Sequence, residues 1–173
     1  MKMSKGVEWA AHACAVLALL PPGSALPGEA LADFLDVPPP YMAKQLQALS
    51  RAGIVTAQRG VAGGYRLARP ADAISLWDIA AAVEGSAPIF RCTEVRRNGP
   101  CGASPAECPG PCEIAAAFRS AETAYRQALA AVPLTDIVAG AARTATAERK
   151  QRITEWIERE FRESSREWTS KRN

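Results

Sequence analysis

Two groups of side chains in this sequence have the chemistry of metal ligands. Glu8 and the only histidine, His12, stand four residues apart near the start of the chain. Carboxylates, imidazoles and thiolates all bind transition metals. Four of the five cysteines fall between residues 92 and 112, at Cys92, Cys101, Cys108 and Cys112. What these residues do depends on the elements that carry them.

Glu8 and His12 lie within GVEWAAHACAV, which predicts a helix from residue 3 to about residue 20. Val7 and Cys14 follow the spacing of a buried helix face, so Cys14 is predicted to be a small buried apolar residue. Residues at i and i+4 project from the same side of a helix, one turn apart. Two ligands are too few for a metal site, and alone Glu8 and His12 are more simply a pair on the helix surface.

The cysteines lie in SAPIFRCTEVRRNGPCGASPAECPGPCEI, whose proline and glycine content predicts a loop over residues 86–112. Eight, six and three residues separate them, which is not the paired C-x-x-C pattern of a zinc ribbon. Thiolates also hold iron–sulfur clusters, and Cys112 stands at the start of a predicted helix whose dipole favours the thiolate. The loop therefore favours an iron–sulfur cluster over zinc.

The surrounding elements predict a winged helix-turn-helix over residues 1–85. A second helix is predicted in GEALADFLDV, and a third in PPPYMAKQLQALSRAGIV, where prolines fit the first turn and Gly53 ends the helix. IVTAQRGVAGGYRLARP alternates around glycines and predicts a β-hairpin, and SLWDIAAAVEG predicts a fourth helix. The expected fold class is mainly α with a small β-hairpin wing.

Basic side chains cluster where such a domain contacts double-stranded DNA. The 26 residues between positions 44 and 69 contain no acid and hold five basic residues, Lys44, Arg51, Arg59, Arg66 and Arg69. We expect Lys44, Arg51 and Arg59 mainly to contact phosphates, with Arg59 also able to enter the minor groove, and Arg66 also to bind DNA. Tyr41 and Gln45 lie on the early turns of the third helix, and Gln45 is predicted to contact a base edge. The alternative for Gln45 is a solvated helix residue.

Residues 112–132 predict a long helix with one apolar stripe, made by Ile114, Phe118, Ala121, Tyr125 and Leu129. A long helix beside a small DNA-binding unit is most simply a dimerisation helix, so a homodimer is expected. Residues 133–173 predict a C-terminal helical extension that packs on the body or on a second subunit.

Composition limits the other functions. The 173 residues suffice for one domain with an arm, and a net charge of +3 decides nothing about nucleic acid by itself. The apolar run over residues 13–20 is too short to cross a membrane, so a cytoplasmic protein without a membrane partner is expected. An enzyme with a cysteine nucleophile and His12 as base is disfavoured, because no orienting group or oxyanion site is visible. No small-molecule substrate is expected.

The stretch LADFLDVPPPYMAKQLQALSRAGIVTAQRGVAGGYRLARPADAISLWDIAAAVEG, with the cysteine loop after it, resembles the Rrf2 family of bacterial winged-helix regulators. The resemblance covers about residues 1–140, and the RGVAGGYRLARP wing and the AAVEG ending are its most distinctive parts. It implies a repressor that forms a homodimer, has a long helix crossing between subunits, and binds an inverted-repeat operator.

The family's clusters usually take three loop cysteines and one nitrogen or oxygen ligand. Here the presence of both Glu8 and His12 is most similar to the family's redox sensors, whose 2Fe-2S cluster is held by two cysteines, a glutamate and a histidine. The resemblance then implies a cluster between subunits, with Glu8 and His12 from one subunit and two cysteines from the other. Cys92 and Cys112 are the expected cysteines, because each adjoins a regular element.

Cys108 and then Cys101 are the next candidates for ligands. Trp9, beside Glu8, is a candidate redox relay, with a packing role as its alternative. Adding one electron would add one negative charge, worth about 4 kcal/mol at about 4 Å in an effective dielectric of about 20. That exceeds the roughly 1 to 3 kcal/mol of ordinary allosteric coupling. A nitric-oxide-sensing cluster, a zinc site and thiol-based sensing are the alternatives.

Overall fold

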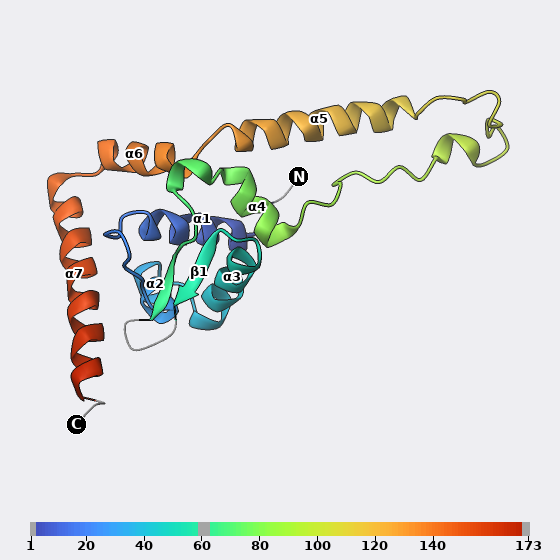
Figure 1. Cartoon of the computed structure of the whole chain (residues 1–173). Helices are drawn as coiled ribbons and strands as arrows, with labels where there is room; N and C mark the ends of the chain where they lie inside the picture. Colours follow the sequence, from blue (N-terminus) through green and yellow to red (C-terminus); the bar gives the residue numbers. More distant parts are fainter. Residues whose placement is uncertain (1–2, 59–62, 171–173) are drawn as a thin grey trace.

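The computed structural model describes residues 3–58 and 63–170. Helices α1 (Lys5–Leu17), α2 (Gly28–Phe34) and α3 (Pro39–Arg51) come first. The antiparallel strands β1 (Val55–Gln58) and β2 (Gly64–Leu67) follow, and then a 3-10 turn, η1 (Ala71–Ala73), and helix α4 (Leu76–Glu84). This order confirms the predicted winged-helix fold, mainly α with one hairpin (Figure 1).

Local sequence signals explain where α3 and α4 begin and end. Prolines occupy the first turn of α3, where their missing N–H groups cost no helical hydrogen bond. Gly53 follows α3 with a φ of 68°, a conformation that side chains disfavour. The Ser75 hydroxyl accepts from the Asp78 N–H at 3.1 Å, and the Asp78 carboxylate accepts from the Ser75 N–H at 2.8 Å. This capping box starts α4.

The hairpin is fastened to the segment between α1 and α2. Val55 pairs with Leu67 at the base of the hairpin, and the Tyr65 N–H donates to the Leu26 carbonyl at 2.7 Å. Gly64 has a φ of +152°, and a Cβ there would lie 2.3 Å from the Leu26 backbone. Only glycine fits this close approach, which explains one of the glycines in the wing sequence.

The core of the domain is built around α1, which packs against α3 and α4. Ala10, Ala13 and Cys14 of α1 are fully buried, together with Leu46 and Leu49 of α3. Small residues on α1 allow the neighbouring helices to approach closely. Burial raises the pKa of the Cys14 thiol to about 12, so this cysteine stays neutral, as expected of a small apolar core residue.

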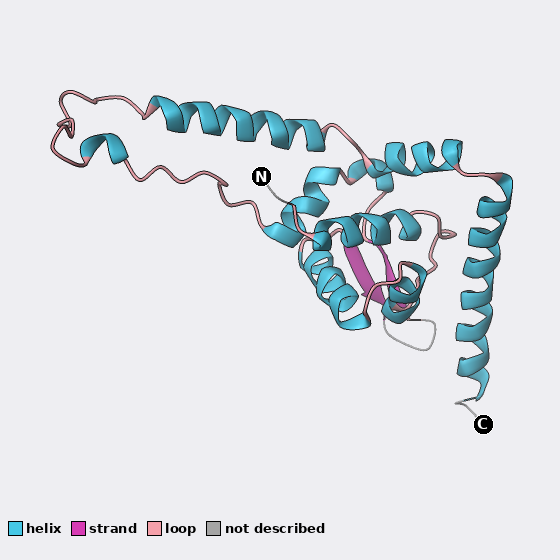
Figure 2. Ribbon diagram, turned by 180° about the vertical axis from the view of Figure 1, so that it is seen from behind, coloured by secondary structure: helices cyan, strands magenta, loops and turns pink. Residues whose placement is uncertain are grey.

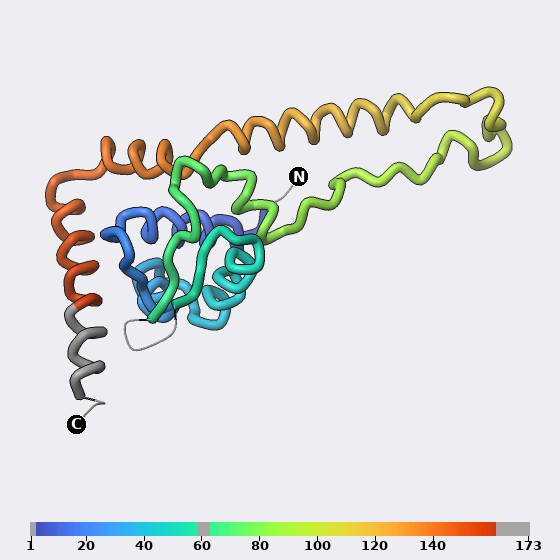
Figure 3. Tube along the Cα trace, in the orientation of Figure 1, coloured from blue at the N-terminus to red at the C-terminus, as the bar shows by residue number. Residues whose placement is uncertain are grey.

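A long arm leaves the domain after α4. The chain turns at Gly85, runs outward through the 3-10 turn η2 (Val95–Arg97), and returns as α5 (Glu113–Ala130). Figure 3 shows the outgoing segment running beside α5 for much of its length, with the turn at the tip of the arm. The predicted loop over 86–112 and helix over 112–132 agree with these bounds.

The C-terminal extension consists of two helices, α6 (Leu134–Thr144) and α7 (Ala147–Ser170). Figures 1 and 2 show α7 on the side of the domain that lies away from the arm. The Trp156 ring packs on Phe34 of α2 with centroids 4.7 Å apart, and Ile157 is buried. In the described part of the chain, no helix combines the length and apolar character needed to cross a membrane.

The burial of Cys14 predicts a specific loss of stability at alkaline pH. In the unfolded chain the thiol ionises near its ordinary value of 9.0, whereas the folded chain keeps the proton up to about pH 12. Above pH 9 the unfolded state therefore binds fewer protons, and the free energy of unfolding falls by about 1.4 kcal/mol per pH unit. Below pH 9 Cys14 has no effect of this kind.

Urea denaturation of the wild type and Cys14→Ala at about pH 8 and about pH 10 measures this contribution. The wild type should lose about 1 kcal/mol more than the variant over that interval. Equal losses in the two proteins would show that Cys14 ionises in the folded state.

Candidate metal centre and nucleic-acid interface

Cys92 and Cys112 come together where the outgoing segment of the arm meets the start of α5. The Ala115 and Ile114 N–H groups at the start of α5, the neighbouring Cys92 side chain and the positive charge of Arg96 hold the pKa of the Cys112 thiol below its usual value. The structure therefore places Cys112 at a helix N-terminus with Cys92 as a neighbour.

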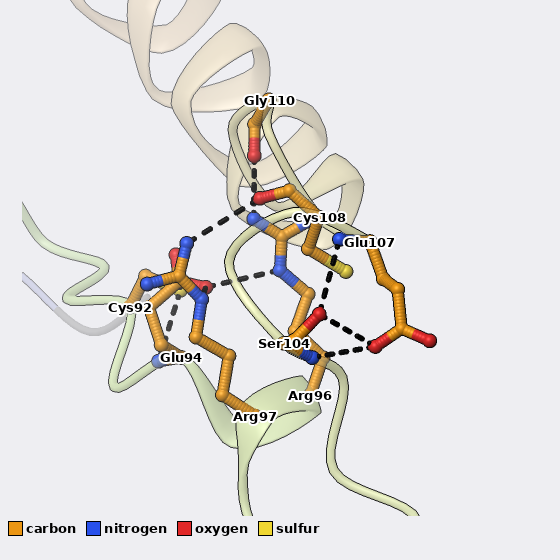
Figure 4. Close-up of polar contacts among 8 residues, drawn as sticks. All are labelled: Cys92, Glu94, Arg96, Arg97, Ser104, Glu107, Cys108 and Gly110. Atoms are coloured by element: carbon orange, nitrogen blue, oxygen red, sulfur yellow. Dashed lines mark hydrogen bonds and ion pairs between the residues drawn. The ribbon is translucent and has the colours of Figure 1, made fainter.

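Two arginines from η2 hold the loop in this shape (Figure 4). The Arg96 guanidinium donates to the Gly110 carbonyl at 2.5 Å and pairs with the Glu94 carboxylate at 3.0 Å. Arg97 donates to the Cys108 carbonyl at 3.4 Å. These contacts join the two sides of the loop, so that a segment rich in glycine and proline keeps a defined path.

Glu94 connects this network to the first cysteine. Its N–H donates to Cys92 Sγ at 3.4 Å, and its backbone has a φ of 54°. The hydrogen bond and charge of Arg96 lower the pKa of the Glu94 carboxyl, so it is ionised. Arginine neutralises the acid, and the loop retains positive charge next to the two thiols.

Cys101 and Cys108 occupy different surroundings. Cys101 is exposed, whereas Cys108 is partly buried and close enough to Arg96 for an electrostatic interaction. All five cysteines are free thiols. Among residues 3–58 and 63–170, no three histidine, cysteine, aspartate or glutamate side chains of one chain are arranged to hold a metal ion.

Glu8 and His12 are both exposed on α1, on the body of the molecule. Figure 1 shows that the arm carries the cysteine loop away from this body. The structure thus places a carboxylate and an imidazole on α1 and the cysteines on the arm, and one chain does not bring these two groups together.

Trp9, next to Glu8 on α1, contacts α3. Its ring meets Tyr41 edge to face, with centroids 5.9 Å apart and planes inclined by 65°. Tyr41 remains 57% exposed at the start of α3. Because Trp9 adjoins Glu8 in the sequence, a single ring contact links the residue next to Glu8 with Tyr41 of α3.

The exposed face of α3 carries Tyr41, Lys44, Gln47 and Arg51. The predicted base contact of Gln45 does not fit, because its side chain is only 5% exposed and faces α1. A Cβ at Gly6 would lie 2.9 Å from Gln45 Oε1, and Gln45 Nε2 donates weakly to the Tyr41 carbonyl at 3.4 Å. Gln47, which the sequence analysis does not name, occupies an exposed position on α3. The burial of Gln45 was predictable, because Gln45 shares the helical spacing of the buried Met42 and Leu49.

The wing contributes fewer described contacts. Arg66 is exposed on β2, opposite Thr56 of β1. Arg69 pairs with the Asp78 carboxylate at 3.3 Å and helps to hold α4. Arg59, predicted to contact DNA, lies outside the described residues.

Comparison with known proteins identifies the family. The Rrf2 family model, described as an iron-dependent transcriptional regulator, matches residues 3–140. The chain belongs to the Rrf2 family. The match includes the winged domain and the whole arm. The family to which the chain belongs is one of transcriptional regulators.

Two curated relatives of this Rrf2 protein are named as HTH-type transcriptional regulators. It is 43% identical over 90 residues to slr0846 of Synechocystis sp., covering 52% of this chain and 61% of that protein. It is 35% identical over 91 residues to YwgB of Bacillus subtilis, covering 53% of this chain and 58% of that protein. The chain thus spans about three fifths of the length of these relatives.

Two solved structures share the fold of this Rrf2 protein. One is IscR of T. potens, with a TM-score of 0.63 and 21% identity, covering 86% of this chain and 95% of that chain. The other is CymR, the global cysteine regulator of B. subtilis, with a TM-score of 0.62 and 22% identity, covering 80% of this chain and 97% of that chain. At this identity the likeness supports the fold alone.

The geometry of α3 predicts different outcomes for two neighbouring substitutions. Lys44→Ala should weaken binding to a random-sequence DNA duplex and lower the slope of log affinity against log salt by about one, because one phosphate contact is lost. Gln45→Ala should leave that slope unchanged and lower the free energy of unfolding by about 1 kcal/mol, because it removes a buried side chain.

Fluorescence anisotropy over a salt series and urea denaturation measure the two effects. Arg119→Ala, which removes an exposed charge from the arm, is the control for Lys44→Ala. If Gln45→Ala changed the salt slope and not the stability, the assignment of Gln45 to the core would be wrong.

Proposed function

We propose that this Rrf2 protein is a cytoplasmic, dimeric repressor that binds an inverted-repeat operator and senses redox state through a 2Fe-2S cluster. Cys92 and Cys112 hold the cluster from the arm of one subunit, and Glu8 and His12 hold it from α1 of the other. In this respect the protein is like the family's redox sensors with mixed cysteine, glutamate and histidine ligands. The observation that carries the proposal is that contacts across the arm bring the segment with Cys92 to the start of α5, where Cys112 is a thiol of lowered pKa.

The donor set fits such a cluster. Main-chain N–H groups at the start of α5 lower the pKa of the Cys112 thiol and Cys92 is its neighbour, so the arm offers two soft ligands in one place. Glu8 and His12 are exposed and one helical turn apart on α1, so both can face a second subunit. When bound, a 2Fe-2S cluster supplies reversible one-electron chemistry.

The shape of one chain supports the dimer. On the arm, Ile114, Phe118 and Val95 are exposed apolar side chains of the two segments that carry Cys92 and Cys112. Large exposed apolar groups of this kind mark an interaction surface. A second copy that covers them would also bring its own α1 to the cysteines and complete both sites by symmetry.

A route from this site to DNA also lies within the described residues. Trp9 adjoins Glu8 and contacts Tyr41, which is on the exposed face of α3. The extra negative charge that accompanies reduction would act on Glu8 and its neighbours, and Trp9 would pass the change to the recognition helix. We therefore assign Trp9 the role of relay.

Anaerobic purification tests the proposal directly. We expect a coloured protein with about two irons and two sulfides per subunit, bleached reversibly by dithionite. Cys92→Ser and Cys112→Ser should abolish the visible spectrum, whereas Cys101→Ser and Cys108→Ser should keep it. A protein that stays colourless after anaerobic reconstitution with iron and sulfide would contradict the cluster and favour thiol or zinc chemistry, while the DNA-binding function would stand.

Mixing two inactive variants tests whether the ligands come from different subunits. Cys112→Ser and His12→Ala should each lack the cluster. Their heterodimer contains one complete site, made by α1 of the first chain and the arm of the second. Reconstitution of a mixture refolded together should therefore recover a spectrum, up to about one quarter of the wild-type intensity from random pairing. No recovery, with heterodimers present on a gel of differently tagged chains, would place all four ligands in one chain.

A further inference from the structure

Side chains on one face of α5 bind the outgoing segment of the arm and fix its position along the helix. We define the strap as residues 85–91, which lead from α4 to Cys92. Its Ser86 and Ala87 carbonyls accept from Arg126 Nη2 at 3.0 and 3.4 Å. The Ile89 N–H donates to the Glu122 carboxylate at 3.2 Å. Arg126 and Glu122 stand one helical turn apart on α5.

An aromatic stack continues the same row toward the cysteines. Phe90 of the strap stacks on Phe118 of α5, with centroids 4.5 Å apart and planes within 12°. Phe118 is one turn before Glu122, so successive turns of α5 contact successive parts of the strap. The contacts therefore fix the position of the strap along α5 as well as its distance from it.

Lengths along the two segments agree with this register. The 14 steps along the helix from Arg126 back to Cys112 rise about 21 Å at about 1.5 Å per residue. The six steps from Ser86 to Cys92 span at most about 20 Å at about 3.3 Å per residue. A segment anchored at Arg126 is therefore just long enough to bring Cys92 to Cys112. A slip by one residue would displace Cys92 by about 3.3 Å and separate the thiols.

The anchor is partly buried and also contacts the DNA-binding domain. Arg126 forms an ion pair with Glu122, whose side chain is 9% exposed. The Arg126 guanidinium lies over the Trp77 ring of α4, 4.9 Å from its centroid. Arg126 Nε is buried and has no hydrogen-bond partner among the described residues. A partly buried, charge-assisted contact of this kind is strongly directional.

The end of the strap that Arg126 binds also lies next to α1. Glu84, the last residue of α4, accepts a hydrogen bond from the Ser4 N–H at 2.6 Å, at the start of α1. The strap therefore begins at the junction of α1 with α4 and leads to Cys92.

We propose that Arg126 and Glu122 are positioning residues that set the register of the strap, hold Cys92 opposite Cys112, and connect the thiol pair to α4. The effect on a bound cluster rests on the proposed function, whereas the effect on the two thiols does not. A test on the cluster-free, reduced full chain therefore separates the two proposals.

The test measures how readily one reagent bridges the two thiols. The full chain with Cys101→Ser and Cys108→Ser is treated with dibromobimane, which becomes fluorescent when it joins two neighbouring thiols. We expect Arg126→Gln to slow the gain of fluorescence in the monomer band about tenfold, since several charge-assisted hydrogen bonds are lost. Arg126→Lys, which keeps one donor group, should restore part of the rate, and Glu122→Gln should give an intermediate rate.

Arg119→Gln is the matched control, because it removes an exposed arginine from the same helix. It should bridge at the parent rate, and circular dichroism should show equal helix content in all variants. Should Arg126→Gln fail to fold, the comparison of Arg126→Lys and Glu122→Gln with the parent decides. Bridging at the parent rate in the folded Arg126 and Glu122 variants would overturn the inference.

The cluster gives an independent second measurement. If the parent chain binds a cluster, Arg126→Gln should shift its visible spectrum or reduction potential relative to Arg119→Gln. If the parent binds no cluster and bridging still depends on Arg126, the positioning role stands and the proposed cofactor is wrong. If the parent binds a cluster and bridging ignores Arg126, the proposed function stands and the positioning role is wrong.

Discussion

The burial of one side of α1 is the constraint on which the other functional elements depend. Ala10, Ala13 and Cys14 are fully enclosed between α3 and α4, so α1 cannot rotate without opening the core. The opposite side must then carry the exposed Glu8 and His12. The same packing brings Trp9 to α3 and the start of α1 to the end of α4. The two side chains proposed as ligands thus lie on a helix whose opposite side is fixed in the core.

The arm is held in shape by different contacts, because it has no hydrophobic core of its own. Its path is fixed by polar contacts with main-chain groups and by one aromatic stack, while Ile114 and Phe118 remain 65% and 52% exposed. Apolar surface on a projecting hairpin is unfavourable unless another surface covers it. In the proposed function, a cluster bound by the two thiols of the arm also needs two further ligands. In the proposed dimer, the association of two subunits would cover the apolar surface of the arm and also supply these ligands.

Periodicity and turn chemistry predicted the winged domain, because each element carries its own signal. Prolines start α3, Gly53 follows it, and Ser75 with Asp78 starts α4. Gln45 was misplaced because a polar side chain was taken as exposed, although its helical spacing places it in the core beside Gly6. A residue type predicts burial less well than its place in the period.

The meeting of Cys92 with Cys112 could be expected only through the family resemblance, and the contacts that cause it could not be predicted at all. Arg126 binds main-chain carbonyls of the strap, and Arg96 binds the carbonyl of Gly110. Carbonyl groups are present at every residue, so no pattern of side chains marks the acceptors. The division of the C-terminal extension into α6 and α7 does have a signal in the sequence, since the Thr146 hydroxyl accepts a hydrogen bond from the Arg149 N–H at 3.2 Å and caps the start of α7.

The energy needed for regulation is small compared with what such a site can supply. A tenfold change in operator affinity requires about 1.4 kcal/mol. One added charge at an effective dielectric of about 20 acts with about 1.7 kcal/mol on a unit charge at about 10 Å, and more strongly at shorter range. Trp9 of α1 contacts Tyr41 of α3, with ring centroids 5.9 Å apart, so the helix that carries Glu8 and His12 is in direct contact with the helix that exposes Lys44. Because the buried side of α1 fixes this helix in the core, an added charge beside Glu8 would act on the neighbouring side chains rather than be relieved by moving the helix.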